Sequence, residues 1–352
     1  MKVLIVKLSA LGDVVQALPV AMAIRRQVPS AELHWLVEEP SAELLAGHPA
    51  LDQVLVSPRH RLFHQDCNAL SVVGAFVRRL RATRYDAVLD LQGLMKSAIF
   101  VALCRGGRKI GFRGGKEPAA AWPLTERLAP YDPDRHALER YLDLLEPLGL
   151  MRPAWPEFGL EPPAELQAEV RRVLLAEMGG GPLVVLHPVA KWESKLWPAG
   201  HWVELARGLS AAGARVVLSG SRADRPVTRA IAAGAGREGE VRDLAGRTSL
   251  PGLAALLVQA RLLVSTDTGV MHLAAALGVP VVALFGPTAP WRTGPYGGGH
   301  VVLRRGLECS PCFRRRCEDP RCLSGLAPEV VMEAVREVLA RPAERDTPGD
   351  TA

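Results

Sequence analysis

Residues 265–272 read Ser-Thr-Asp-Thr-Gly-Val-Met-His and decide how the C-terminal half of the chain is interpreted. They follow an apolar strand, Arg261-Leu-Leu-Val264, and precede an apolar helix that continues from Leu273. A strand that turns at once into a helix leaves several backbone N–H groups directed at one point, and the positive end of the helix dipole lies at the same point. This arrangement predicts a site for a phosphate or diphosphate group.

Strands and helices alternate along the rest of the chain. In the N-terminal half, apolar runs typical of buried strands lie at 2–8, 32–37, 53–56, 86–91 and 109–112, with helical patterns at 13–28, 69–83 and 93–105. In the C-terminal half, strands are predicted at 182–187, 214–219, 261–266 and 280–285, with helices at 199–212, 223–234, 250–260, 269–278 and 328–340. Such alternation predicts an α/β protein with parallel sheets and right-handed crossovers.

A proline-rich segment separates the two alternating halves. Four prolines fall within residues 151–165, a density typical of a linker. We therefore predict two Rossmann-like, doubly wound domains facing across a cleft, at 1–158 and 165–340, followed by a disordered polar tail at 341–352. Doubly wound sheets bind ligands beyond the carboxyl ends of their strands, so the expected site is the cleft between the domains.

The composition is that of a soluble globular protein with a basic excess. Of 352 residues, 48% are hydrophobic and 23% charged, and the formal net charge is +6. The sequence contains no run of about 18 apolar residues, so no membrane span is predicted. Lys7 and Asp13 interrupt the first apolar run too early for a signal peptide, so a cytoplasmic location is expected. The positive excess favours an anionic partner. Nothing resembles a helix-turn-helix, a zinc finger or an aromatic RNA platform, which disfavours nucleic acid.

Asp13 is the first candidate for chemistry. It follows the first strand in Lys7-Leu-Ser-Ala-Leu-Gly-Asp13, a loop that lacks both the dinucleotide fingerprint Gly-x-Gly-x-x-Gly and the Gly-Lys-Ser/Thr ending of a phosphate-binding loop. One interpretation is an N-cap of the first helix. The other is a general base, because a carboxylate can take the proton of an alcohol as bonding develops in the transition state.

Three further positions follow strands of the C-terminal half. Asp267 to His272 can be an ordinary capped helix, but the density of small polar residues and a second polar turn, Phe285-Gly-Pro-Thr288, favour a nucleotide-phosphate site. Lys195 precedes a helix whose dipole prefers anions, so it is interpreted either as a phosphate ligand or as a solvated lysine. Asp224 lies just past a strand end, where a carboxylate can bind ribose hydroxyls or cap the next helix.

Basic residues gather in the N-terminal half. The arginines at 78–84 fit the solvated face of a helix. Another group falls in or beside loops that follow strands, where an anionic acceptor could reach it: Arg59, Arg61, Lys96, Arg113 and Lys116.

Four of the six cysteines cluster near the C-terminus, at Cys309, Cys312, Cys317 and Cys322. In a reducing compartment this spacing predicts a structural zinc or iron ion. The alternative is a surface loop of packed or partly disulfide-linked thiols. A catalytic metal is disfavoured, because four thiolates leave no open coordination position.

The chain carries five sets of motifs in a specific order: Lys2-Val-Leu-Ile-Val-Lys-Leu-Ser-Ala-Leu-Gly-Asp-Val-Val15, Asp90-Leu-Gln-Gly-Leu-Met-Lys-Ser-Ala98, Lys195-Leu-Trp-Pro198, Asp243-Leu-Ala-Gly-Arg-Thr-Ser-Leu250, and residues 265–272 with 285–288. This set resembles the bacterial lipopolysaccharide heptosyltransferases, family 9 of glycosyltransferases, from residue 1 to about 340. The resemblance implies a GT-B architecture of two Rossmann-like domains. It also implies transfer of heptose from ADP-L-glycero-β-D-manno-heptose to the inner core of lipopolysaccharide, with inversion and without a divalent metal.

The resemblance also implies roles for individual residues. Asp13 resembles the base that activates the acceptor hydroxyl, and Lys195 a group that neutralises the departing ADP. The backbone of Thr268, Gly269 and Val270 resembles the diphosphate site. Asp267 and His272 fall near the heptose and phosphates of the sugar donor, Asp224 near its ribose and Thr248 near its adenine. Ser194 provides the one hydroxyl in a loop where some family members have a pair of threonines near the phosphates. Arg59, Arg61, Lys96 and Lys116 fall where the family binds the anionic Kdo and phosphates of its acceptor.

The sub-family and two rival classes stay open at this stage. The N-terminal half, with residues 35–39, looks most like the enzymes that add the first heptose to Kdo-lipid A. The cysteine-bearing C-terminal half is more like those that add the second or a later heptose to heptosyl-Kdo-lipid A. Either acceptor implies a cytoplasmic enzyme, peripheral to the inner face of the cytoplasmic membrane. A nucleotide-binding regulator without activity is disfavoured, because binding alone needs no base at Asp13. A redox or iron–sulfur protein is disfavoured, because the cysteines lie outside the strand-end cleft.

Overall fold

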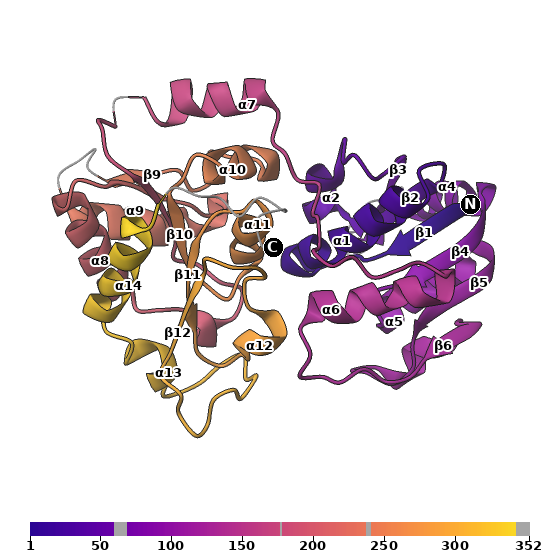
Figure 1. The fold of residues 1–352 in the computed structure, drawn as a ribbon. Helices are drawn as coiled ribbons and strands as arrows, with labels where there is room; N and C mark the ends of the chain where they lie inside the picture. The colour runs from indigo at the N-terminus through magenta and orange to yellow at the C-terminus, as the bar shows by residue number, and fades with distance from the viewer. Residues whose placement is uncertain (60–68, 177, 237–240, 343–352) are drawn as a thin grey trace. The chain divides into compact units, whose positions relative to one another are not determined.

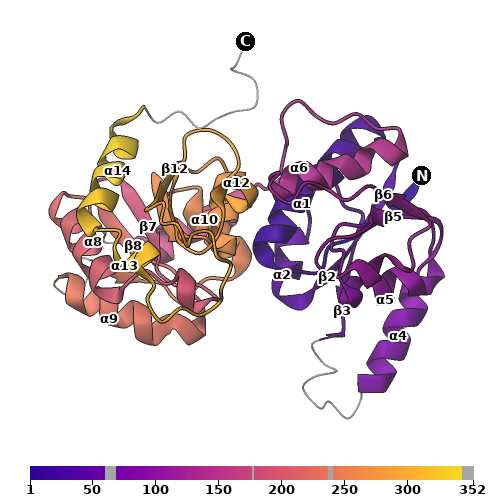
Figure 2. The same ribbon diagram turned by 90° about the horizontal axis from the view of Figure 1, so that it is seen from below.

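The protein is described by a computed structural model at residues 1–59, 69–176, 178–236 and 241–342. The chain divides into two compact units, Met1–Gly159 and Leu160–Ala352, and the division falls within the proline-rich segment 151–165. Each unit is a parallel six-stranded sheet covered by helices (Figures 1 and 2). The predicted α/β class with two Rossmann-like domains is confirmed.

The first unit has its strands in the order β3-β2-β1-β4-β5-β6, all parallel. They span β1 (Lys2–Val6), β2 (Glu32–Glu38), β3 (Gln53–Ser57), β4 (Arg84–Asp90), β5 (Arg105–Phe112) and β6 (Glu126–Leu128). The helices are α1 (Leu11–Gln27), α2 (Glu39–Leu45), α4 (Ala69–Ala82), α5 (Met95–Leu103) and α6 (Ala137–Leu142). The order reverses between β1 and β4, and such a switch point is where doubly wound sheets bind ligands.

The second unit repeats the same order as β9-β8-β7-β10-β11-β12, with its switch point between β7 and β10. The strands are β7 (Leu183–His187), β8 (Arg215–Leu218), β9 (Val241–Asp243), β10 (Leu262–Thr266), β11 (Val281–Phe285) and β12 (Val301–Arg304). The helices are α7 (Ala164–Glu169), α8 (Ala199–Ala211), α9 (Arg225–Ala235), α10 (Leu250–Leu257), α11 (Gly269–Ala276), α12 (Pro290–Thr293), α13 (Arg321–Ser324) and α14 (Pro328–Ala340).

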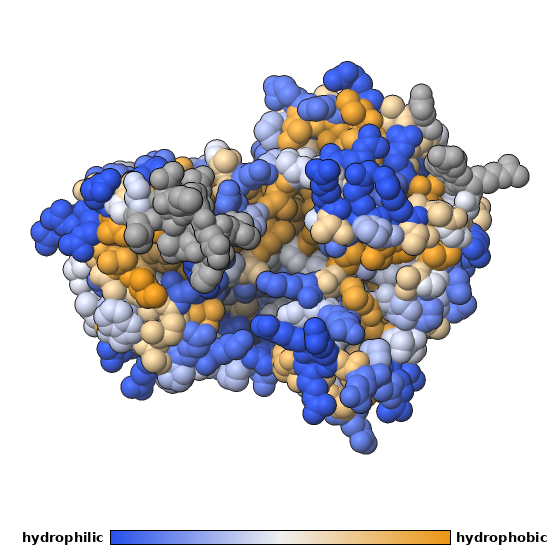
Figure 3. All heavy atoms as spheres, turned by 180° about the vertical axis from the view of Figure 1, so that it is seen from behind, coloured by the Kyte–Doolittle hydropathy of each residue, from blue (hydrophilic) through white to orange (hydrophobic). Residues whose placement is uncertain are grey.

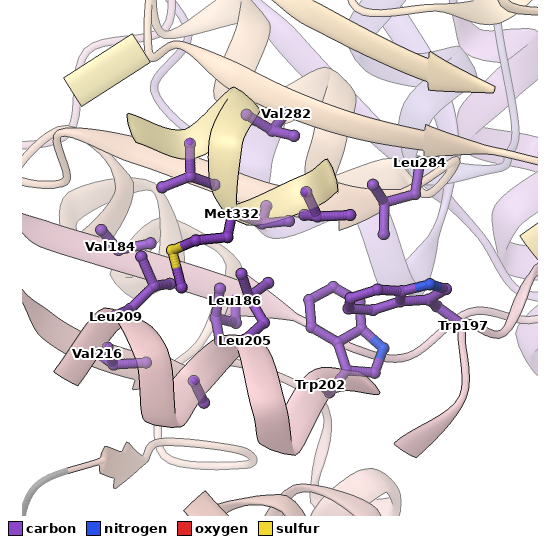
Figure 4. Packing of buried hydrophobic residues seen from close by; sticks show 14 of the residues in the cluster. Val184, Leu186, Trp197, Trp202, Leu205, Leu209, Val216, Val282, Leu284 and Met332 are labelled. Carbon is purple, nitrogen blue, oxygen red and sulfur yellow. The ribbon is translucent and has the colours of Figure 1, made fainter. Parts of the chain in front are cut away.

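The central strands of both sheets are buried on both faces, which explains their continuous apolar runs. In the second unit, α8 and α14 pack on one face of the sheet around two tryptophans (Figure 4). Trp197 and Trp202 meet edge to face with ring centroids 5.0 Å apart, a favourable geometry for aromatic pairs. The indole N–H of Trp197 donates to the carbonyl of Leu326 at 2.8 Å. Trp197 therefore fixes the loop before α8 to the core.

Some predicted boundaries were wrong. The first strand ends at Val6 rather than at residue 8, because the N–H of Leu8 bonds to the side chain of Gln92. The predicted helix 93–105 covers only Met95–Leu103, and β5 already begins at Arg105. The short strands β6, β9 and β12 were not predicted. They lie at or near the sheet edges and lack the long apolar run that marks a central strand.

On the face drawn in Figure 3, hydrophilic and hydrophobic side chains are interspersed. Within the described residues, no helix combines the length and the apolar character needed to cross a bilayer.

Candidate functional site

The predicted site residues of the first unit lie where its parallel strands end together. Val6 pairs with both Leu36 and Asp90, and Glu38 pairs with Ser57, so the loops that follow these strands start at one edge of the sheet. That edge carries the chemistry-bearing residues Lys7, Asp13, Glu38, Arg59 and Lys96. The register therefore brings together residues that are far apart in the sequence.

Asp13 lies in the first turn of α1, at the acceptor position of a capping box. The N-cap position itself is occupied by Ala10, so Asp13 is not the N-cap, but its carboxylate caps the start of the helix from the third helical position. Asp13 Oδ2 accepts the backbone N–H of Ala10 at 3.1 Å, and Oδ1 accepts the hydroxyl of Tyr141 at 3.2 Å. Its side chain remains 41% exposed, which leaves it accessible to a substrate hydroxyl. This geometry is compatible with a general base.

Lys7 lies behind Asp13 and is almost fully buried. Its Nζ donates to the hydroxyl of Tyr141 at 2.7 Å and to the carbonyl of Leu91 at 3.0 Å, and it lies 3.9 Å from Asp13 Oδ1. Burial lowers the pKa of Lys7 below its usual range, although Asp13 and Asp90 oppose the shift. Burial also raises the pKa of Tyr141 well above its usual value, so the phenol is neutral and can donate.

Glu38, at the end of β2, holds two of the predicted acceptor-binding residues. Arg59 Nη1 lies 2.9 Å and Lys96 Nζ 3.2 Å from Glu38 Oε1, and Lys96 also donates to the hydroxyl of Ser9. Burial raises the pKa of Glu38, but Lys96 and Arg59 outweigh it and hold the pKa below its usual value. The carboxylate therefore keeps two cations side by side at the strand edge, where an anion could bind.

The other two predicted acceptor-binding residues are less defined. Lys116 is exposed in the loop between β5 and β6. Arg61 lies outside the described residues.

In the second unit, the switch point between β7 and β10 brings Lys195 and Asp267 together. Lys195 Nζ lies 2.6 Å from Asp267 Oδ2 and 3.3 Å from the Asp267 carbonyl, and it also lies over the ring of Trp192. Both side chains are largely buried. Lys195 is therefore not the solvated surface lysine of the alternative interpretation.

Asp267 leads directly into α11, which begins as predicted. Thr268 is the N-cap and its hydroxyl accepts from Met271 N–H at 3.5 Å, so the capped-helix interpretation holds for this residue. Gly269 and Val270 form the first turn, and His272 is buried in the next.

Two buried hydroxyls lie near the same strand ends. Thr266 closes β10 and Thr288 follows β11, and neither Oγ1 has a hydrogen-bond partner within the described part of the chain. Buried polar groups are normally paired, so unpaired hydroxyls at a helix N-terminus are a signal of a polar ligand. Together with Lys195, which pairs with Asp267 directly after β10, these hydroxyls suit a diphosphate.

Ser194 and Asp224 have structural partners in the second unit. The Ser194 hydroxyl donates to the carbonyl of Arg314 at 2.6 Å, which ties this loop to the cysteine-bearing segment. Asp224 Oδ2 accepts from both the N–H and the hydroxyl of Ser221, at 2.7 and 2.6 Å, which is the capping role that the sequence left open. Their proposed contacts with phosphate and ribose stay predictions.

Two further residues are His187 at the end of β7 and Thr248 in the loop after β9. His187 closes β7 and its Nδ1 forms a hydrogen bond with the Ser219 hydroxyl at 3.0 Å; burial lowers the pKa of His187 to about 4, although Asp224 opposes the shift. Thr248 lies half-buried in the loop between β9 and α10, directly before the N-cap Ser249. The adenine contact of Thr248 stays a prediction.

The four clustered cysteines are free thiols. Among the described residues, no three His, Cys, Asp or Glu side chains are grouped so that they could hold a metal ion. Burial, followed by the charge of its neighbouring cysteines, raises the pKa of the Cys322 thiol above its usual value. As these residues are arranged, they form no closed metal site, and the structural zinc or iron stays a prediction.

Sequence reasoning missed three residues of the first unit. Lys7 carried a local signal, because a lysine directly after a buried strand is unusual. Glu38 carried a weaker signal as an acidic residue at a strand end. Tyr141 carried none, since it lies 128 residues from Asp13 and reaches it through α6.

Comparisons with known proteins extend over both units. The model of glycosyltransferase family 9 (heptosyltransferase) matches residues 73–322. Lipopolysaccharide heptosyltransferase 1 of Pseudomonas aeruginosa is 35% identical over 367 residues, which cover 97% of this chain and 99% of that protein. Two solved structures of the Escherichia coli heptosyltransferase WaaC are 30% identical and cover 96% of this chain. The one with ADP has a TM-score of 0.78 over 100% of its chain, and the one with ADP-2-deoxy-2-fluoro heptose has 0.76 over 99%.

Proposed function

This chain belongs to glycosyltransferase family 9, the heptosyltransferases, and from that membership we propose that it transfers L-glycero-D-manno-heptose from ADP-heptose to the Kdo/heptose inner core of lipopolysaccharide. The reaction proposed is the addition of the first heptose, onto Kdo-lipid A. The likeness to lipopolysaccharide heptosyltransferase 1 over nearly the full length supports this sub-family.

The observation that carries the proposal is the position of Lys195 beside the start of α11. Lys195, held by Asp267, supplies a positive charge, and Thr268, Gly269 and Val270 supply the first N–H groups of the helix. These groups suit the pyrophosphate of ADP-heptose and stabilise the charge that develops on it as it leaves. The same groups replace the charge of a divalent cation, so we propose that transfer needs no metal cofactor.

Asp13 supplies the other half of the proposed chemistry. The acceptor hydroxyl oxygen attacks the anomeric carbon of the heptose while Asp13 takes the hydroxyl proton. The bond from that carbon to the β-phosphate oxygen breaks, and ADP leaves with the electron pair. Attack opposite the leaving group inverts the anomeric centre.

The acceptor is proposed to bind the first unit. Arg59 and Lys96, paired through Glu38, suit the carboxylates of Kdo and the phosphates of lipid A, with Lys116 and Arg61 as further cations. Because the acceptor is a lipid, the enzyme is proposed to be cytoplasmic and to work at the inner face of the cytoplasmic membrane, bound peripherally.

The test is to incubate the protein with ADP-heptose and either Kdo2-lipid A or its mono-heptosylated form, and to measure product masses. We expect one added heptose on Kdo2-lipid A and none on the second acceptor. Addition only to the mono-heptosylated form would assign a second or later heptose instead. Absence of transfer to both, with ADP-heptose still bound, would identify a non-catalytic nucleotide-sugar-binding relative.

A second arm of the test addresses Asp13. The variant Asp13→Asn should bind ADP-heptose but lose transfer by at least about a hundredfold. Asp86→Asn is the matched control, because Asp86 accepts the N–H of Lys2 at the amino end of the sheet, away from the site. Wild-type turnover in Asp13→Asn would remove Asp13 from the mechanism.

A further inference from the structure

Lys7, Tyr141 and Asp13 form a hydrogen-bonded chain that leads from the interior of the first unit to its strand-end edge. Lys7 comes from the end of β1, Asp13 from the first turn of α1, and Tyr141 from α6, which packs beside α1 (Figure 1). The distances along the chain are 2.7 Å from Lys7 Nζ to Tyr141 Oη and 3.2 Å from Tyr141 Oη to Asp13 Oδ1. Nothing in the proposed reaction requires either Lys7 or Tyr141 to touch a substrate.

The direction of the hydrogen bonds from Lys7 through Tyr141 to Asp13 follows from the chemistry of the three side chains. A lysine ammonium has three donors and no acceptor, so the Tyr141 oxygen must accept from a charged Lys7. The single phenol proton of Tyr141 is then donated to the other partner, Asp13 Oδ1. A tyrosine alone could rotate its hydroxyl away, whereas Lys7 removes that freedom.

The second oxygen of Asp13 is also held. Asp13 Oδ2 accepts the backbone N–H of Ala10, so each carboxylate oxygen accepts from a hydrogen-bond donor that the fold holds in place. Two donors on opposite oxygens define the plane of the carboxylate and favour its ionised form.

We propose that Lys7 and Tyr141 are positioning residues that hold Asp13 ionised and in one orientation, ready to accept the proton of the acceptor hydroxyl. This inference rests on the proposed role of Asp13 as the base. Lys7 is confined to this task by burial: its side chain is only 3% exposed, and its other hydrogen bond goes to the carbonyl of Leu91.

Among the described residues, three other charged groups act on Lys7 or Tyr141. Asp90 at the end of β4 and Lys96 on α5 interact with Lys7, and Arg140, next to Tyr141 on α6, interacts with both Lys7 and Tyr141. None of the three replaces the Tyr141 hydroxyl as a donor to Asp13 Oδ1 in the contacts described above. A variant that lacks only this hydroxyl therefore changes the base without changing the surrounding charge.

The test compares Tyr141→Phe with the wild type in the full-length protein. We expect kcat to fall at least tenfold at pH 7 with little change in the KM for ADP-heptose, because the phenol acts only through the base. We also expect the acid limb of the plot of kcat against pH to shift to higher pH by about one unit. The Asp13 carboxylate loses a hydrogen-bond donor that stabilises its ionised form, so a higher pH is needed to ionise it. Lys7→Met should shift the limb in the same direction.

Tyr85→Phe is the matched control. Tyr85 is a buried tyrosine of the same unit, and its hydroxyl pairs with His34 Nδ1 at 2.9 Å, so this variant also loses one buried hydroxyl. It should leave the pH profile unchanged. A merely structural role for Tyr141 would lower kcat without moving the acid limb, and that result would overturn the proposal.

Asp13→Asn separates the two levels of the argument. If Asp13→Asn is inactive and Tyr141→Phe has a wild-type profile, the positioning role is wrong and the base assignment survives. If Asp13→Asn turns over like the wild type, the base assignment fails and the positioning role fails with it.

Discussion

Lys195 Nζ lies 2.6 Å from Asp267 Oδ2, and the two residues belong to the loops after the neighbouring strands β7 and β10. Their side chains are 15% and 8% exposed, respectively. A lysine held in such a pair keeps its ammonium group beside the first turn of α11 before any ligand arrives. Binding a diphosphate there does not require the side chain to be ordered first, which lowers the entropic cost of association.

Removal of the Lys195 charge should therefore weaken ADP binding specifically. In Lys195→Met the dissociation constant for ADP should rise by about 10- to 100-fold, the range for loss of a hydrogen bond to a charged group. Isothermal titration with ADP measures it. Lys191→Met, an exposed lysine on the same loop, is the control and should bind ADP like the wild type.

Part of this loss should come from the carboxylate that Lys195 leaves behind. An unpaired Asp267 would repel the diphosphate, so the double variant with Lys195→Met and Asp267→Asn should recover some affinity. An unchanged dissociation constant in the single variant would exclude Lys195 from the donor site.

Lys96 should affect the acceptor and leave the donor alone. Lys96→Ala removes one of the two cations that Glu38 holds, so the KM for the anionic lipid acceptor should rise about tenfold, with ADP affinity unchanged. Lys2→Ala is the control, because Lys2 also forms an ion pair with a strand glutamate, Glu32, but at the opposite end of the sheet. Equal effects of the two variants on the acceptor KM would point to general charge rather than to a site.

The architecture was readable from the sequence because parallel strands buried on both faces leave continuous apolar runs. Val3 to Val6 and Leu262 to Val264 are fully buried, and their sequence shows it. The strands β6, β9 and β12 were not predicted, because strands at or near an edge of the sheet have half-exposed positions and lack a continuous apolar run. The family resemblance, confirmed by the comparisons, came from motifs at strand ends, where local sequence and position in the fold coincide.

The site was readable only where a local pattern exists. The sequence from Asp267 to His272 predicts a helix N-terminus within a few residues, and α11 begins there. The pairing of Lys195 with Asp267, by contrast, depends on β7 lying beside β10, and the contact of Tyr141 with Asp13 depends on α6 packing on α1. Such partners are set by tertiary structure across long stretches of chain, so no spacing in the sequence encodes them.

The anchor of the Lys195 loop should be measurable separately from its charge. Trp197→Phe keeps a buried ring but loses the hydrogen bond from the indole N–H to the carbonyl of Leu326. That carbonyl then lacks its partner, so the variant should be destabilised by about 1–3 kcal/mol and should bind ADP more weakly. Urea unfolding and titration with ADP give the two numbers.

Trp202→Phe provides the matched control for this anchor. The Trp202 indole nitrogen is buried without a hydrogen-bond partner among the described residues, so the same substitution removes no hydrogen bond. ADP affinity should stay at the wild-type value in Trp202→Phe. An equal loss of affinity in both variants would attribute the effect to core packing rather than to the loop anchor.

Chelation should leave the reaction intact. Because Lys195 and the N-terminus of α11 supply the positive charge, turnover in excess EDTA should equal turnover in its absence. Elemental analysis of the same sample decides the cysteine segment. One zinc or iron per chain would show that Cys309, Cys312, Cys317 and Cys322 gather around an ion, whereas a metal-free, fully active protein would show that the predicted structural ion is absent and not needed for the reaction.

The stability of the fold should depend on His187 below neutral pH. Its pKa is about 4 in the folded protein, against an ordinary value near 6.5 in the unfolded chain, because burial disfavours the charged ring. As the pH falls below about 6.5, His187 becomes protonated in the unfolded chain, whereas in the folded protein it stays neutral until about pH 4. The stabilisation is complete above this window and is lost through it, with a cost of about 2 kcal/mol at pH 5.

His187→Asn removes this titration and keeps a polar group beside Ser219. Urea unfolding at pH 7.5 and pH 5 gives the difference in free energy for each protein, so any pH-independent cost of the substitution cancels. The wild type should lose about 2 kcal/mol more than the variant between the two pH values, since all other groups contribute equally. An equal loss in both would mean that the His187 ring takes up its proton as readily in the folded protein as in the unfolded chain, contrary to its burial at the end of β7.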